Sequence, residues 1–136
     1  MSIRICRLGS PRLPDEGPRI GAVRFLPRGV PKAEYSSRDF FDSWLPALAP
    51  SSELLKWFRT EPFSEARWKQ FGRRYRAEMA EPEVRRLLGL LALFSRSSNF
   101  SVGCYCQDEQ HCHRSLLRSL LEEAGAEVRS EPHPAG

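Results

Sequence analysis

The residues best suited to chemistry are crowded into residues 104–114, which read Cys-Tyr-Cys-Gln-Asp-Glu-Gln-His-Cys-His-Arg. This segment holds three of the four cysteines and two of the three histidines of the chain. A disulfide framework spaces its cysteines so that they connect distant loops, whereas cysteines crowded beside histidines are typical of a site. We therefore expect reduced thiols here, with no native disulfide among Cys104, Cys106 and Cys112.

The elements around this segment indicate what kind of site it is. Residues 100–106 alternate in a strand pattern, and a helix is expected from His113 to Ala124. The segment thus joins the carboxyl end of a strand to the amino end of a helix, where ligands bind in open α/β sheets. Free backbone amides and the positive end of the helix favour an anion there. The same field would lower the pKa of Cys112 if this cysteine lies exposed in the first turn.

An anion-binding pocket is the first interpretation of this segment. A phosphate or carboxylate would be held by the helix end and by Arg114, with Arg24 or Arg28 as further partners. The competing interpretation is purely structural. In it, the thiols are small buried hydrophobic groups, and the histidines and the arginine cap the helix or form salt bridges.

Two other interpretations use the thiols directly. Cys112 could act as a nucleophile paired with His111 or His113, although neither Cys106 nor Cys112 stands at the Cys-x5-Arg spacing of phosphatases from Arg114. The segment also offers more than the four nitrogen and sulfur ligands of a structural zinc site: Cys104, Cys106, His111, Cys112 and His113. One short loop can hardly supply four tetrahedral ligands, and the Cys-x2-Cys pair of common zinc ribbons is absent. We therefore expect no bound metal.

Hydrophobic periodicity predicts the sheet that positions this segment. Strands are expected at residues 3–8, 20–25 and 100–106, with a last short strand at 126–129. Residues 39–45 favour one or two helical turns. If strand 20–25 lies beside strand 100–106, their carboxyl ends meet at one edge of the sheet and bring Arg24 and Arg28 near Arg114.

The middle of the chain is helical by pattern. Ser51 or Ser52 is expected to cap a short helix, Ser64 a second one, and Pro82 to begin a third. A strand, loop, helix and strand near the end suggest a right-handed parallel crossover. The sequence thus predicts an α/β fold: a single-domain layered sandwich with a mainly parallel sheet of about four strands flanked by helices, over residues 1–130, with a flexible tail at 131–136.

Composition limits the partners. The chain has 136 residues, of which 40% are hydrophobic and 28% charged, and no apolar run approaches the ~18 residues that span a bilayer. Its start lacks the apolar core of a secretory signal, so we expect a cytoplasmic protein with no membrane partner. Eighteen of the 21 basic residues are arginine, which suits phosphates but is also what a GC-rich coding bias produces. Residues 100–136 carry three basic and six acidic groups, which weakens a nucleic-acid interpretation of the site.

Three motifs resemble those of one bacterial family. Cys104-x7-Cys112-His113-Arg114 looks like the Cys-x7-Cys-His-Arg signature of the family named domain of unknown function 488 (DUF488). The stretch 24–29, Arg-Phe-Leu-Pro-Arg-Gly, resembles its early Arg-x-x-Pro-Arg motif. The stretch 71–78 resembles its Phe-x3-Tyr-x2-Glu segment, with Tyr75 and Glu78 in the matching positions.

The resemblance implies a small cytoplasmic α/β protein in which these three segments gather about one pocket, and it brings no settled activity. This chain also departs from the family pattern. Members commonly have an Asp just before the early Arg, where this chain has Val23. If that Asp takes part in chemistry or metal binding, Val23 puts activity here in doubt.

The sequence therefore favours a small protein with a pocket that binds an anionic, phosphate- or nucleotide-like ligand. The predicted ligand-binding residues are Arg24, Arg28, Cys104, His111, Cys112, His113 and Arg114, and the candidates for a catalytic role are Cys112, His113 and Arg114. The alternatives are a nucleic-acid-associated accessory protein that uses the Arg-rich surface, and a thiol-dependent enzyme. No cofactor is expected, and the sequence gives no indication of the oligomeric state.

Overall fold

A sheet of four parallel strands forms the centre of the computed structural model, which describes residues 1–106 and 112–129. The strand order is β1-β4-β2-β3, where the strands are β1 (Ile3–Arg7), β2 (Arg19–Gly21), β3 (Ser43–Trp44) and β4 (Phe100–Cys104). β4 pairs with β1 on one side and with β2 on the other. The predicted adjacency of the second strand and the 100–106 strand is therefore confirmed, as is the layered α/β fold.

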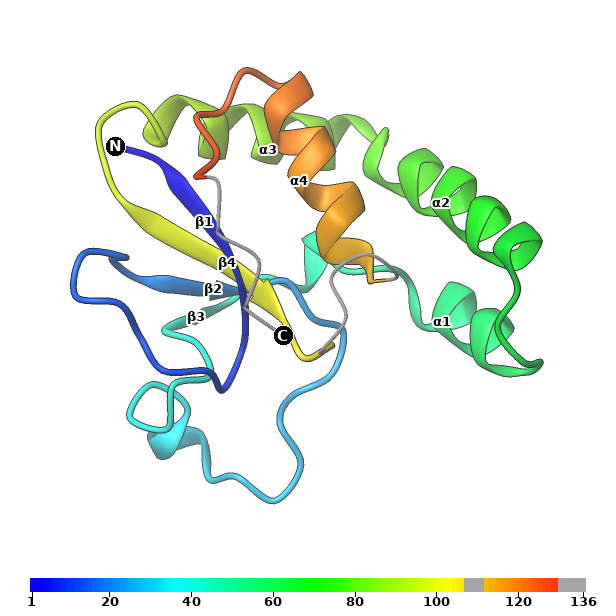
Figure 1. Ribbon diagram of the computed structural model, residues 1–136, viewed down its shortest axis with the longest axis horizontal. Coiled ribbons are helices and arrows are strands. Elements are labelled where there is room, and N and C mark those ends of the chain that lie inside the picture. The colour runs from blue at the N-terminus through cyan, green and yellow to red at the C-terminus, as the bar shows by residue number, and fades with distance from the viewer. Residues whose placement is uncertain (107–111, 130–136) are drawn as a thin grey trace, which may run out of the picture.

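The described residues also form four α-helices (Figure 1): α1 (Ser52–Arg59), α2 (Glu65–Met79), α3 (Pro82–Phe94) and α4 (His113–Glu123). The predicted caps of the first two are confirmed, because Ser51 Oγ accepts from the Leu54 amide and Ser64 Oγ from the Arg67 amide. α2 and α3 both pack against α4. Within residues 1–106 and 112–129, no helix is long and apolar enough to cross a membrane.

Two hydrophobic clusters hold these layers together. The larger one lies between the sheet and the helices and includes Ile3 and Ile5 of β1, Val102 of β4, Tyr75 of α2 and Leu117 of α4. The smaller one, which we call the thiol-side cluster, consists of Cys6, Leu8, Val23, Phe41, Cys104 and Cys112. The thiols of the predicted site are thus part of a packed apolar cluster.

The structure differs from the sequence prediction at residues 39–45. They do not form helical turns. Asp39 has a positive φ of 64° and reverses the chain, after which Ser43 and Trp44 pair with Ile20 and Gly21 as β3. β3 has only two residues, which is too short to produce a recognisable period-two pattern. The predicted strand at 126–129 is reduced to a single parallel bridge between Val128 and Ile3.

A buried ion pair fastens the loop after β1 to the sheet. Arg19 is fully buried and donates to both carboxylate oxygens of Glu16, from Nε and from Nη2, at 3.0 Å each. Ser101 Oγ and Arg4 Nη1 also donate to this carboxylate, at 2.6 and 2.9 Å. Burial alone would raise the pKa of Glu16, but the hydrogen bonds from Arg19, Ser101 and the Leu13 amide outweigh it and lower this pKa to about 2. The pair is therefore ionised and well satisfied.

Candidate functional site

The thiols of the site lie where β4 ends and α4 begins. Cys104 is the last residue of β4, and Cys112 is the N-cap residue of α4. β4 lies in the interior of the sheet, so its carboxyl end is flanked by β1 and β2. Figure 1 shows the start of α4 close to the end of β4. The expected junction of strand end and helix start is therefore present.

Three sulfur atoms meet at this junction. The Sγ atoms of Cys104, Cys106 and Cys112 all lie within 4.8 Å of one another, and those of Cys104 and Cys112 are 2.8 Å apart. Cys104 and Cys112 are buried, at 1% and 2% exposed, whereas Cys106 is exposed. All three are free thiols in this structure. The cluster therefore joins a buried pair to one thiol at the surface.

The three thiols do not share charge evenly. Burial raises the pKa of Cys104, and its hydrogen bonds to the other two sulfurs raise it further. Hydrogen bonds from Cys104 and Cys112 lower the pKa of Cys106, with smaller contributions from His113 and Arg114. The exposed thiol is therefore the most acidic of the three.

Cys112 differs from the sequence prediction in its acidity. A hydrogen bond from Cys104 lowers its pKa, but Cys106 and burial outweigh that effect and raise the pKa to about 11. The prediction required an exposed cysteine in the first turn. Cys112 is instead the buried N-cap, and its side chain forms no capping hydrogen bond, so desolvation outweighs the helix field.

His113 is held in one orientation between β2 and α2. Its Nε2 lies 2.7 Å from the carbonyl oxygen of Ala22, and its Nδ1 lies 3.7 Å from Cys112 Sγ. The ring packs edge to face against Tyr75, with centroids 5.7 Å apart. Burial lowers the pKa of His113. A neutral imidazole that donates from Nε2 leaves Nδ1 as an acceptor beside the Cys112 thiol.

Arg114 is a buried cation without a carboxylate partner. It is 5% exposed, and its Nη2 donates to the carbonyl oxygen of Cys106 at 2.6 Å. Its Nε is buried and has no hydrogen-bond partner among the residues that the structure describes. Over the same residues, no ion pair joins Arg114 to an acidic side chain. An unpaired buried guanidinium is costly in a folded protein.

The other predicted binding residues lie in different surroundings. Arg24 donates from Nε to the Pro50 carbonyl, and from Nη2 to the carbonyls of Pro46 and Ala49. Its guanidinium is thus bound to the chain that leads into α1. Arg28 is exposed in the loop after β2. His111 lies outside the described residues.

Two of the three motifs that resemble the family, the one at 24–29 and the one at 71–78, meet around residues 46–51. Tyr75 donates to the Leu48 carbonyl at 2.7 Å, and Glu78 accepts from the Ser51 amide at 2.8 Å. Arg24 binds carbonyls of the same stretch. These residues therefore hold the backbone that precedes α1, and Tyr75 in turn supports His113.

The three sulfurs could hold a thiophilic metal ion, but a closed structural zinc site needs a fourth ligand. Among the described residues, only Cys104, Cys106 and Cys112 form such a group. His113 is not a member of it, and its Nε2 is engaged with Ala22. The expectation of no bound zinc stays a prediction.

Sequence reasoning gave too little weight to Cys106 and Val23. Cys106 was not among the predicted ligand-binding or catalytic residues, yet it is the exposed member of the thiol cluster. Its position two residues after Cys104 was the available signal. Val23 is 4% exposed and packs in the thiol-side cluster. The position at which the resembling family commonly has an Asp therefore lies beside Cys104 and Cys112.

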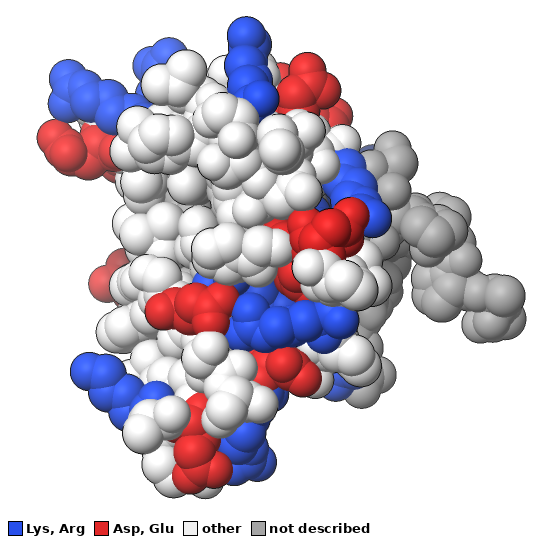
Figure 2. All heavy atoms as spheres, turned by 90° about the vertical axis from the view of Figure 1, so that its left-hand side faces the viewer, with Lys and Arg blue, Asp and Glu red and all other residues white. Residues whose placement is uncertain are grey.

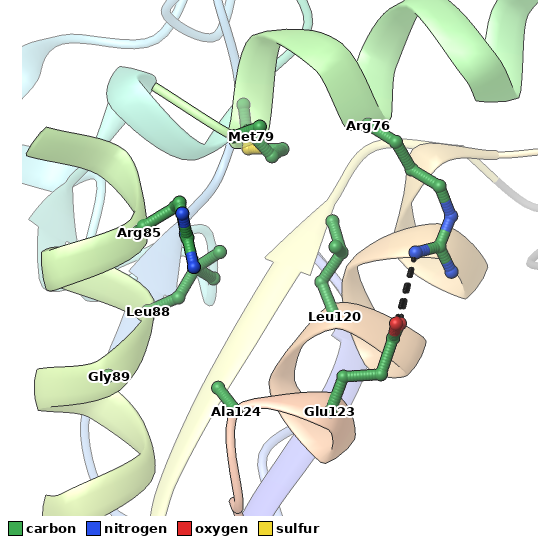
Figure 3. Close-up of a pocket in the computed structure, with 9 residues that line it drawn as sticks. Arg76, Met79, Arg85, Leu88, Gly89, Leu120, Glu123 and Ala124 are labelled. Carbon is green, nitrogen blue, oxygen red and sulfur yellow. Dashed lines mark hydrogen bonds and ion pairs between the residues drawn. The ribbon is translucent and has the colours of Figure 1, made fainter. Parts of the chain in front are cut away.

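A separate cavity lies at the far end of α4 (Figure 3). Its volume is about 520 Å³, and it is lined by residues of α2, α3 and the carboxyl-terminal half of α4. Arg76 and Arg85 reach it from two walls, and Arg76 is paired with Glu123 at 3.0 Å. The thiols are at the opposite end of this helix.

The fold and the site define a class of small parallel α/β proteins with a Cys-His-Arg segment between a central strand and the following helix. Within that class the chain belongs to the DUF488 family, since the family model described as the active DUF488-N3 subclade matches residues 3–125. The chain is also similar to uncharacterised proteins of Mycobacterium bovis and of two Mycobacterium tuberculosis strains. Each is 31% identical over 91 residues, which cover 64% of this chain and 71% of the relative. No solved structure matches the chain significantly.

Proposed function

We propose that the start of α4 binds a small anionic group of the phosphate or nucleotide type through Arg114. The observation that carries this proposal is the buried Nε of Arg114, which has no acceptor among the described residues. A buried guanidinium donor without an acceptor is stabilised by an anionic ligand, because the ligand supplies the missing charge-assisted hydrogen bond.

The helix end supports the same ligand. The first amides of an α-helix have no acceptor within the helix, and the Cys112 side chain does not cap them. Amides and the helix dipole at this position favour a negative charge. Arg114 is the second residue of α4, so its guanidinium and these amides belong to one short stretch of chain.

The thiolate of Cys106 competes with such a ligand. Arg114 contributes to lowering the pKa of Cys106, so the same guanidinium faces two negative charges when an anion binds. Removing the thiolate should relieve this repulsion. Cys106→Ser is therefore expected to bind phosphate more tightly than the wild type, whereas a purely structural role of the cluster predicts no gain in affinity.

Calorimetric titration with inorganic phosphate and with nucleotides at low salt tests the proposal. A charge-assisted hydrogen bond contributes about 1.5–3 kcal/mol, so Arg114→Gln should weaken binding by about tenfold or more. Arg114→Lys should recover only part of the loss, because a point charge does not replace the guanidinium fork. Arg118→Gln, one turn further along α4, is the matched control and should bind as the wild type does. Equal affinity in all four proteins would overturn the proposal.

Nucleic acid is the alternative anionic partner. The face of the molecule in Figure 2 carries acidic side chains interspersed among the basic ones. Binding through a broad Arg-rich surface would fall steeply with salt and would survive Arg114→Gln. Binding at Arg114 predicts instead that Arg114→Gln lowers the affinity for phosphate when the salt concentration is held constant.

A second candidate function, a thiol-dependent enzyme, is favoured by one contact. Nδ1 of His113 lies 3.7 Å from Cys112 Sγ, while Nε2 is engaged with the Ala22 carbonyl. An oriented base beside a thiol is the usual arrangement for activating a cysteine nucleophile. If Cys112 is the nucleophile, iodoacetamide should alkylate Cys112 more slowly in His113→Gln than in the wild type, and by more than any change in the exposure of Cys112 explains. An unchanged alkylation rate would exclude this role.

A further inference from the structure

The thiol cluster has a property that anion binding does not use. Cys104 and Cys112 are buried with their sulfurs 2.8 Å apart, and Cys106 is exposed with its sulfur within 4.8 Å of both. A buried pair of facing thiols needs little displacement to form a disulfide, which requires sulfur atoms about 2 Å apart. An exposed third thiol gives a solvent-borne oxidant a point of entry.

We propose that the cluster is a peroxide-reactive site in which Cys106 is oxidised first and a disulfide between Cys104 and Cys112 is the final product. The oxidant is hydrogen peroxide. The Cys106 thiolate attacks one peroxide oxygen, the O–O bond breaks, and Cys106 becomes a sulfenic acid while hydroxide leaves and is protonated to water.

Two exchange steps then carry the oxidation inward. Cys112 attacks the sulfenic sulfur of Cys106, which forms a Cys106–Cys112 disulfide and releases water. Cys104 next attacks the Cys112 sulfur, which forms the Cys104–Cys112 disulfide and returns Cys106 to its thiol state. Overall, two thiols lose two electrons and two protons, and one peroxide becomes two waters.

The surroundings suit these roles. Hydrogen bonds from its two neighbours and the charge of Arg114 lower the pKa of Cys106, and the thiolate is the form that reacts with peroxide. Burial raises the pKa of Cys104, which protects this thiol from direct oxidation. Cys6 is also buried, and burial raises its pKa. It lies in β1 and serves as the internal control.

The product would alter the proposed anion pocket, a consequence that rests on the proposed function. Cys112 directly precedes His113 and Arg114, so a bond to Cys104 ties the start of α4 to the end of β4. The oxidised protein is then expected to bind phosphate more weakly than the reduced one. The disulfide itself can be measured without any ligand, so a failure of the disulfide proposal can be told apart from a failure of the anion-binding proposal.

The test treats the reduced, metal-free full chain with hydrogen peroxide, blocks the remaining thiols with N-ethylmaleimide and maps the products by mass spectrometry. Cleavage at Asp108 separates Cys112 from the other two cysteines, so a disulfide that joins the resulting peptides identifies Cys112, and fragmentation identifies its partner. The wild type should lose two of its four thiols, with Cys104 joined to Cys112, and dithiothreitol should restore both.

Three variants make the test specific. Cys106→Ser should still form the Cys104–Cys112 bond but about tenfold more slowly, because the entering thiolate is gone. Cys112→Ser should leave a sulfenic acid on Cys106 that dimedone traps. Cys6→Ala should behave as the wild type does. Four titratable thiols remaining after a treatment that oxidises free cysteine would overturn the proposal, as would oxidation of Cys106→Ser at the wild-type rate.

Discussion

The carbonyl oxygen of Ala22 lies 2.7 Å from Nε2 of His113 and fixes where this imidazole carries its proton. A carbonyl can only accept, so Nε2 must donate, and Nδ1 is left free toward Cys112. The amide of Ala22 in turn donates to the Gly103 carbonyl at 2.9 Å. Ala22, which directly follows β2, therefore links β4 to His113, the first residue of α4.

Replacing His113 should show how much its hydrogen bond to the Ala22 carbonyl stabilises the fold. His113→Asn is too short to reach the Ala22 carbonyl, and leaving this buried acceptor without a partner should lower the free energy of unfolding by about 1–3 kcal/mol. His113→Gln keeps an N–H at a similar reach and should lose less. Urea unfolding of both variants measures the difference. Equal stability of the two would show that the Ala22 contact contributes little.

Acid should weaken the protein through Glu16. The pKa of this carboxyl is about 2 in the folded chain and 4.5 for the ordinary group. Because the folded pKa is depressed, the stabilisation is fully present above pH 4.5 and is lost as the pH falls from about 4.5 toward 2. Urea unfolding at a series of pH values should therefore show a falling midpoint across this window.

Glu16→Gln provides the matched comparison. It leaves Arg19 buried without its countercharge, so at pH 7 the variant should be about 3–5 kcal/mol less stable. Its stability should also change less between pH 5 and pH 3 than that of the wild type, since the titrating group is gone. If both proteins lose the same stability over that interval, another carboxyl, such as Asp42 with its pKa of about 2, accounts for the acid response.

Restoring the carboxylate of the family pattern tests the surroundings of the thiols. Val23→Asp places an acid in the thiol-side cluster, where Val23 is 4% exposed. Without a cation in reach, the variant should be destabilised by about 3 kcal/mol or more at pH 7, and the loss should diminish as the pH falls and the buried acid becomes neutral. Thermal unfolding beside the isosteric Val23→Thr measures the cost of the charge. A Val23→Asp variant as stable as Val23→Thr would show that Arg114 pairs with the new carboxylate.

The sequence predicted the parallel sheet and the helix caps because their signals are local. Ser51, Ser64 and Pro82 mark helix starts by residue type alone. The strand-to-helix position of the thiols also followed from local periodicity. The predicted roles of Arg24 and Cys112 depended instead on tertiary contacts. The carbonyls that bind Arg24 are more than 20 residues away in the chain, and the burial that raises the pKa of Cys112 comes from packing with other segments.

The central claim is that Nε of Arg114 binds an anion, and its own N–H resonance reports on this most directly. The protein would be labelled with ¹⁵N-arginine, and the Arg114 Nε–H signal would be assigned by its disappearance in Arg114→Lys. Titration with inorganic phosphate should shift this signal in a saturable manner, with Arg118 Nε–H as the internal reference. An Arg114 signal that stays in place, or that moves only as much as that of Arg118, would contradict the account.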